Sequence, residues 1–298
     1  MKKLNHKFIT LFVILFSLSS LHLSAQKKSI EWSLYGGGGL SFFGYQSPQS
    51  KTRSFGYNWD AGVGFTTFMS YQWGFHVGLG IGQYNVNNRV NDLNNPTHPR
   101  LIDSEGHPFD LYCTLSGYTE THKATFLEIP LMLQFQTKIK NAGNWKKSQK
   151  QSFYAMAGFK FLVLFKRNYE AQVTTLFKKA YYPEVDNWAG TQIFAGLGKF
   201  PGNNADGNFG MGLIAAIALE TGIKWRVREN LNLYTGVYFD CGLNDPTKKF
   251  RKEVGNYTSP ESLEDFSLLK FYKKAFLMNV GIKLRVALFV PKKITSCL

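Results

Sequence analysis

Apolar residues alternate with small or polar residues in eight stretches of the chain. In one stretch Trp59, Val63 and Phe65 lie on one face of a strand, and Asp60 and Gly64 lie on the other. In a soluble sandwich the large residues would face a core, but the glycine-rich opposite faces would leave little to solvate the outside. A transmembrane β-barrel of the outer-membrane type accounts for both faces, because bulky residues meet lipid and small residues fit inside a narrow cylinder.

The eight stretches are long enough to cross a membrane as strands. About 9–11 tilted residues span the hydrocarbon layer, and every stretch is longer than that. The predicted strands cover residues 30–43, 57–70, 73–86, 124–137, 152–167, 209–227, 230–242 and 273–289. The predicted fold class is therefore all-β, an eight-stranded antiparallel transmembrane β-barrel.

The connections between these strands alternate in length along the chain. They comprise long segments at 44–56, 87–123, 168–208 and 243–272, and shorter ones at 71–72, 138–151 and 228–229. Outer-membrane barrels have short periplasmic turns and longer extracellular loops. If the chain starts in the periplasm, every long segment falls outside the cell, so we expect both termini to be periplasmic.

The segment 168–208 leaves a ten-stranded barrel open as the alternative. Two β-prone runs, 169–177 and 191–194, could extend the wall above the membrane. These runs are more polar than the eight strands, and Tyr182-Pro183 interrupts them. Eight strands are therefore the favoured count.

The first residues have the features of a secretory signal. Three lysines among the first seven residues precede an apolar run at 8–18, and Ser24-Ala25 offers a small-residue cleavage site. The apolar run is shorter than the roughly 18 residues that a membrane-spanning helix needs. The predicted organisation is a signal peptide at 1–25 and one outer-membrane β-barrel domain at 26–298.

The formal charge of +15 would suit a nucleic-acid-binding protein, but its distribution argues against that function. Three positive charges lie in the predicted signal, and the acid-free basic run 138–150 falls between two strands. Residues 87–122 hold five acids against two arginines. Solvated turns beside anionic lipid explain this pattern better than a nucleic-acid groove. We expect outer-membrane lipid as a partner and no nucleic acid.

Charged residues also occur on the inward face of the predicted strands. An eight-stranded interior is only wide enough for side chains to fill it, and an unpaired buried charge is costly. We therefore predict a lumen ion network centred on Glu220, Lys160 and Lys283, with Arg285 nearby, rather than an ion pathway. By parity the inward charged residues are Asp60, Glu128, Lys160, Glu220, Lys224, Lys283 and Arg285.

Candidate catalytic and metal-binding groups have little support. His98, His107 and His122 lie in one long segment with a serine and acids nearby, but their spacing fixes no nucleophile and base and offers no metal-ligand pair. The four glycines at 36–39 lie inside a strand and open no helix, which excludes a phosphate loop. We expect no catalytic residue, no metal site and no cofactor, so the chain is not expected to be an enzyme. The odd set Cys113, Cys241 and Cys297 predicts no disulfide framework.

Several segments resemble one known family. Residues 126–133, FLEIPLML, resemble the YLEIPLLL strand of PorT-like outer-membrane barrels, and residues 154–158 resemble the strand that follows it. Residues 208–213 and 231–244, the latter LNLYTGVYFDCGLN, resemble the sixth and seventh strands. The resemblance implies an eight-stranded, OmpA-like fold in a Gram-negative outer membrane. It also implies that some relatives assist the secretion of other proteins.

The last predicted strand carries a pattern of spaced residues, Asn279, Gly281, Leu284 and Val286. It resembles the polar-x-Gly-x-x-apolar-x-apolar insertion signal that the barrel-assembly machinery reads. This resemblance implies that the machinery is a partner of the chain. Nine residues follow Phe289, whereas barrels of this kind often stop at a terminal aromatic residue.

Two functions of different classes remain. The first is a non-enzymatic membrane protein whose long extracellular loops contact a surface ligand or a component of a secretion or surface system. The alternative is a small-solute porin or channel. Strand number discriminates between them, because a packed eight-stranded lumen is closed and a wider one conducts.

Overall fold

The computed structural model describes residues 29–46, 53–138, 150–193, 196–202, 204–208, 212–245 and 274–291. The predicted signal peptide at 1–25 lies outside the described residues. Strands dominate the described part of the chain, and no helix there is long and apolar enough to cross a membrane.

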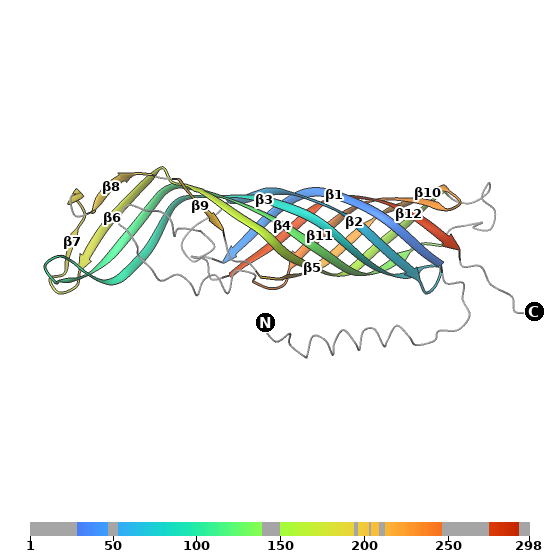
Figure 1. Cartoon of the computed structure of the whole chain (residues 1–298), viewed down its shortest axis with the longest axis horizontal. Helices are drawn as coiled ribbons and strands as arrows, with labels where there is room; N and C mark the ends of the chain where they lie inside the picture. Colours follow the sequence, from blue (N-terminus) through green and yellow to red (C-terminus); the bar gives the residue numbers. More distant parts are fainter. Residues whose placement is uncertain are drawn as a thin grey trace, which may run out of the picture.

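Eight antiparallel strands form a closed ring. Each strand pairs with the next one around the ring, β4 pairs with β5, and β12 pairs with β1 to close it. The strands are β1 (Ser29–Gln46), β2 (Arg53–Phe68), β3 (Trp73–Ile102), β4 (Pro108–Gln136), β5 (Gln151–Gln172), β10 (Ile214–Arg228), β11 (Leu231–Gly242) and β12 (Lys274–Pro291). Figure 1 shows them crossing obliquely at the right. The prediction of an eight-stranded barrel is confirmed, and the ten-stranded alternative is not the topology.

One end of the ring carries tight turns and aromatic residues. Ser70 and Met69 donate backbone hydrogen bonds to the carbonyl of Trp73 in the turn between β2 and β3. Near this end Trp32 packs on Phe65, with ring centroids 5.0 Å apart. Such outward aromatic residues suit an interfacial belt. Trp59 also faces outward, but it lies within β2, where it pairs with Gly38 of β1.

The β3–β4 hairpin continues beyond the ring. These two strands stay paired from Trp73 and Phe135 up to Ile102 and Pro108. The prediction of a long loop at 87–123 is therefore wrong, because only the turn around residues 103–107 separates the two strands.

A second hairpin extends the wall beside the first. After a break at residues 173–174, β6 (Thr175–Tyr182) continues along β4 where β5 stops. On the return, β7 (Asn187–Ala189) and β8 (Gly198–Pro201) pair with β6, and β9 (Asn204–Asn208) pairs with β5. Figure 1 shows this two-hairpin extension at the left. Much of the predicted loop 168–208 is thus strand.

The two halves of β3 show that the buried face changes its chemistry along the chain. In the ring Phe75, Leu79 and Ile81 point outward and are exposed. Further along the same strand Tyr84 and Val86, which have the opposite parity, are fully buried. The ring is therefore apolar outside, and the inner face becomes apolar at the end of the ring next to the extension and stays so within the extension.

The interior of the extension and of the adjacent end of the ring is one apolar core. It is assembled from inward residues of β3, β4, β5 and β6, which pack against one another and against residues at the top of the ring. Its buried members include Tyr84, Val86, Val90, Leu111, Cys113, Leu115, Tyr118, Tyr169, Ala171, Leu176 and Ala180. Polar residues such as Asn87 and Lys123 lie on the outer face of these strands.

Candidate functional site

Charged side chains fill the bore of the ring. Four cations and five carboxylates point inward, and each of these residues is 7 % exposed or less. Near-equal numbers of opposite charges allow most of them to pair without water, which a narrow interior requires. The set is Glu31, Asp60, Glu128, Lys160, Glu220, Lys224, Asp240, Lys283 and Arg285.

Glu31 on β1 gathers donors near the end of the bore where β1 begins. Its carboxylate accepts hydrogen bonds from Lys224 Nζ at 2.8 Å, from Asn232 Nδ2 at 3.0 Å and from the Tyr234 hydroxyl at 2.5 Å. Lys224 also donates to Gln136 Oε1 at 3.0 Å. These contacts join four strands across the bore, so this end of the lumen is closed by a hydrogen-bonded layer.

Glu220 and Arg285 occupy the middle of the bore. The Tyr154 hydroxyl donates to Glu220 Oε1 at 2.9 Å, and Arg285 Nη2 lies 4.0 Å from the same oxygen. The guanidinium stacks over the ring of Tyr234, 4.1 Å from its centroid. Arg285 is therefore held by an aromatic face as well as by a carboxylate.

Two lysine-centred pairs lie further along the bore. Lys160 Nζ lies 2.7 Å from Asp240 Oδ2 and 3.9 Å from Glu128 Oε2. Lys283 Nζ lies 2.8 Å from Asp60 Oδ2. Every carboxylate of this layer is thus within 4 Å of an ammonium group, which offsets part of the desolvation of both charges.

Inward glycines make room for the tyrosines that cross the bore. A Cβ at Gly62 or at Gly80 would meet the Tyr35 hydroxyl at 2.5 Å, and that hydroxyl donates to Glu128 Oε1 at 2.8 Å. At Gly37 a Cβ would meet Asp60 Oδ1 at 2.7 Å. The glycine-rich inner face is therefore occupied by side chains from neighbouring strands.

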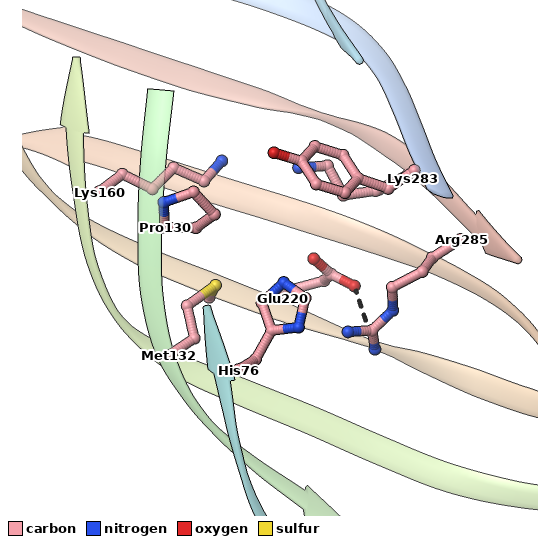
Figure 2. A pocket seen from close by; sticks show the side chains of 8 residues that line it. His76, Pro130, Met132, Lys160, Glu220, Lys283 and Arg285 are labelled. Carbon is pink, nitrogen blue, oxygen red and sulfur yellow. Dashed lines mark ion pairs between the residues drawn. The ribbon is translucent and has the colours of Figure 1, made fainter. Parts of the chain in front are cut away.

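A small cavity remains between the charged layers. Its volume is about 10 Å³, which is room for about one water molecule. Figure 2 shows the Glu220 carboxylate and the Arg285 guanidinium pointing toward each other there, and His76 also lines this cavity. At a separation of 4.0 Å the two groups form an ion pair without a direct hydrogen bond.

A closed ring with an apolar outer face and a charged bore is the architecture of small outer-membrane barrels. The family model described as "Outer membrane protein beta-barrel domain" matches residues 24–248. The chain belongs to this outer-membrane β-barrel family. Its place is therefore the outer membrane.

Solved barrels resemble the chain over most of their length at low sequence identity. OprG of Pseudomonas aeruginosa is 10% identical with a TM-score of 0.34, over 89% of this chain and 97% of that one. Ail of Yersinia pestis, in complex with the heparin analogue sucrose octasulfate, is 8% identical with a TM-score of 0.28, over 89% and 100%. Neisserial surface protein A is 8% identical with a TM-score of 0.29, over 89% and 99%. A search of curated proteins gave no significant match.

The bore of this family member pairs the expected residues in an arrangement that strand counting did not anticipate. Glu220, Lys160 and Lys283 were expected together with Arg285 nearby, and all four line the same small cavity, but Glu220 pairs with Arg285. Lys160 and Lys283 pair with other carboxylates. Strand tilt moves each row of hydrogen-bonded residues along the barrel axis, so parity gives the face of a residue but not its depth in the bore.

Two carboxylates of the bore, Glu31 and Asp240, were not among the inward residues predicted from the sequence. Glu31 alternates with the outward Trp32, and Asp240 alternates with the outward Phe239. The same parity rule applied to the first and seventh strands would have found both.

The three histidines considered for chemistry lie in different settings. His98 belongs to β3 and pairs with Leu111, whereas His107 lies in the exposed turn between β3 and β4. His122 is fully buried in the extension, 3.4 Å from Glu120 Oε1, and burial lowers its pKa to about 3. Among the residues that the structure describes, no group of three or more histidine, cysteine or acidic side chains could hold a metal ion.

The turn around residues 103–107 is ordered by one carboxylate. The backbone amides of His107 and Glu105 donate to Asp103 Oδ1 at 2.8 Å and 2.9 Å. These hydrogen bonds hold the pKa of Asp103 below its usual value. Asp103 thus stabilises the turn. Cys113 and Cys241 are free thiols, and Cys297 lies outside the described residues.

The residues of the expected insertion signal lie on both faces of β12. Asn279 points inward and accepts a hydrogen bond from Ser41 Oγ at 2.6 Å. Gly281 faces the backbone of β1, while Leu284 and Val286 are exposed on the apolar outer face. Recognition of this pattern by the barrel-assembly machinery stays a prediction.

Proposed function

We propose that this outer-membrane barrel is a non-enzymatic protein that conducts no solute and presents its extension outside the cell as an interaction surface. The single observation that carries this proposal is the charged packing of the bore. An accessory role in a secretion or surface system is the role that we favour for the extension.

The filled bore supports a closed barrel. The charged layers around Glu31, Glu220 and Lys160 lie at successive depths, and the cavity beside them has room for about one water molecule. A passing ion or sugar would have to break buried ion pairs, and breaking one such pair typically costs about 3–5 kcal/mol. The alternative function, a small-solute porin, requires a continuous aqueous path through these layers.

The folded extension supports the interaction role. Its hairpins share an apolar core with the adjacent end of the ring, and Lys123 and Glu170 on the outer face are charged. Binding residues are commonly carried by segments that a rigid scaffold positions. Two hairpins that continue rigidly beyond the apolar belt can hold such residues away from the lipid surface.

The topology supports an external extension and periplasmic termini. β1 begins and β12 ends at the end of the ring that carries the turn at residues 69–72. The extension rises from the opposite end. Small barrels place short turns in the periplasm and longer segments outside. The resemblance to PorT-like barrels supports the further step from an exposed surface to a secretion or surface system.

Cysteine labelling of intact cells tests the proposed sidedness. Ser104→Cys puts a thiol in the exposed turn of the extension, and Glu229→Cys puts one in the exposed turn between β10 and β11. A membrane-impermeant maleimide should label Ser104→Cys in intact cells above the wild-type background. It should label Glu229→Cys only after permeabilisation, and the reverse result would overturn the proposal.

A further inference from the structure

An exposed aromatic patch lies on the outer face of the extension, far from the apolar belt. Trp188 is 52 % exposed, and its ring packs against Tyr181 and Tyr112, with centroids 4.8 Å and 4.9 Å apart. Asp110 pairs with Tyr181 across the strands, and the Tyr181 hydroxyl donates to Asp186 at 2.7 Å. We call these five residues the tip patch.

Parity shows that the tip patch belongs to the outer face. The neighbouring residues Leu111 and Ala180, which have the opposite parity, are buried in the core of the extension. The aromatic rings of the patch therefore do not fill the protein interior. Large exposed aromatic groups that pack on one another outside the core are typical of binding surfaces.

The negative charge around the tip patch favours a positively charged partner. Residues 101–112 and 179–190 hold five acids and one lysine, although the whole chain is strongly basic. That lysine, Lys179, lies over the ring of Phe177, 5.0 Å from its centroid. Carboxylates beside aromatic faces are complementary to a cation, and a guanidinium group also stacks on such rings.

We infer that the tip patch binds an arginine-bearing basic segment of a partner protein. This inference rests on the proposed interaction role and names its partner class. The Trp188 and Tyr181 rings supply faces for guanidinium groups, while Asp110 and Asp186 supply the opposite charge. An anionic lipid surface would be repelled by the five acids. A neutral glycan would gain nothing from them.

Peptide binding to the purified, folded protein in a neutral detergent tests the inference. The probes are fluorescein-labelled octa-arginine and octa-lysine, which carry equal charge, and the readout is fluorescence anisotropy. The wild type should bind octa-arginine at least about twofold more tightly than octa-lysine, because arginine is the better partner of an aromatic face. Trp188→Ala should weaken octa-arginine binding about 2–5-fold and remove the preference. Trp188→Phe, which keeps a ring, should give an intermediate loss.

Two variants separate charge from aromatic contact. Asp186→Asn should weaken the binding of both peptides by up to about fivefold. Glu170→Gln is the matched control, because Glu170 is an exposed acid of the extension that pairs with Lys123 away from the tip, and it should change neither affinity. Equal binding of the two peptides, an unchanged affinity for Trp188→Ala, or competition by a neutral oligosaccharide would overturn the inference. Labelling of Ser104→Cys reports the sidedness independently, so failure of either proposal gives a distinct pair of results.

Discussion

Strands β3 and β4 pass through both halves of the molecule, and the two halves use their faces in opposite ways. In the ring, outward residues such as Leu34, Val63 and Ile282 are apolar and are 65 %, 52 % and 65 % exposed, while the bore is charged. In the extension, the inward residues Leu115 and Tyr118 are apolar and fully buried. The backbone runs on without interruption at the level where the pattern reverses.

The difference shows that the surrounding solvent decides the pattern and that the strand itself does not. Next to lipid, apolar side chains gain nothing by turning inward, so the narrow bore can hold pairs of charges. Beyond the lipid, burial of apolar area again stabilises the fold, and the inward positions become apolar. A substitution of an inward charged residue or of an outward apolar residue should therefore affect the ring more, and a substitution of an inward apolar residue should affect the extension more.

The largest expected effect is the loss of the Glu31 carboxylate near one end of the bore. Glu31→Ala leaves the buried Lys224 ammonium without its charged partner and with the Gln136 amide oxygen as its remaining acceptor, which should lower the free energy of unfolding by about 3–5 kcal/mol. The measurement is the urea midpoint of the folded band on unheated gels. Glu170→Ala, which removes an exposed ion pair of the extension, is the control and should cost at most about 1 kcal/mol. Equal shifts would contradict a bore held by charge pairs.

Removal of a large apolar side chain should destabilise the extension more than the ring. Leu115→Ala creates a cavity in the core of the extension and should destabilise that region by about 2–5 kcal/mol. Amide hydrogen exchange should rise in β4 and β6 above the ring and stay unchanged in β1 and β12. Leu34→Ala, on the lipid face, should leave exchange in the extension as it is. If Leu115→Ala leaves protection of the extension intact, that half has no apolar core.

A charge placed on the outer face should lower stability in the ring but not in the extension. Val63→Arg puts a guanidinium in the apolar belt and should cost about 2–4 kcal/mol. Gln172→Arg puts the same group on the polar outer face of the extension, where β5 pairs with β4 and β9, and should be near neutral. The urea midpoints of both variants measured in lipid vesicles provide the comparison. A tolerated Val63→Arg would place that residue outside the membrane.

The hairpin turn should respond to acid. The pKa of Asp103 is lowered in the folded state, so its contribution is present above the unfolded value of about 3.8 and is lost as pH falls through the folded pKa. The protection factors of the His107 and Glu105 amides, taken relative to the intrinsic exchange rate at each pH, should therefore fall below about pH 4. Asp103→Asn should remove this pH dependence, and a wild-type profile for that variant would contradict the role of the carboxylate.

The sequence predicts the ring because lipid leaves a strong signature. Every second residue of the eight strands is apolar on the lipid face, and the predicted order and count of strands are confirmed. The length of the strands beyond the ring was not predictable in the same way. Past Ile81 the outer residues of β3, such as Asn87, become polar. A prediction based on apolar lipid-facing residues therefore placed the end of the strand too early. Apolar and polar residues still alternate beyond that point, but the apolar ones now face inward.

The sequence predicts which charged residues line the bore, but it does not predict which of them pair. Parity alone indicates that Glu220, Lys283 and Arg285 face inward. Which cation meets which carboxylate depends on strand register and tilt, and these set depth across strands that are far apart in the chain. The pair of Asp60 with Lys283 joins residues of β2 and β12, which no local pattern connects.

Planar-bilayer recording of the wild-type protein tests the central claim most directly. The charged layers around Glu31, Glu220 and Lys160 should leave no continuous path for ions, so we predict no steady conductance above that of the lipid alone. A stable current that scales with salt concentration would contradict a closed bore and would favour the porin function.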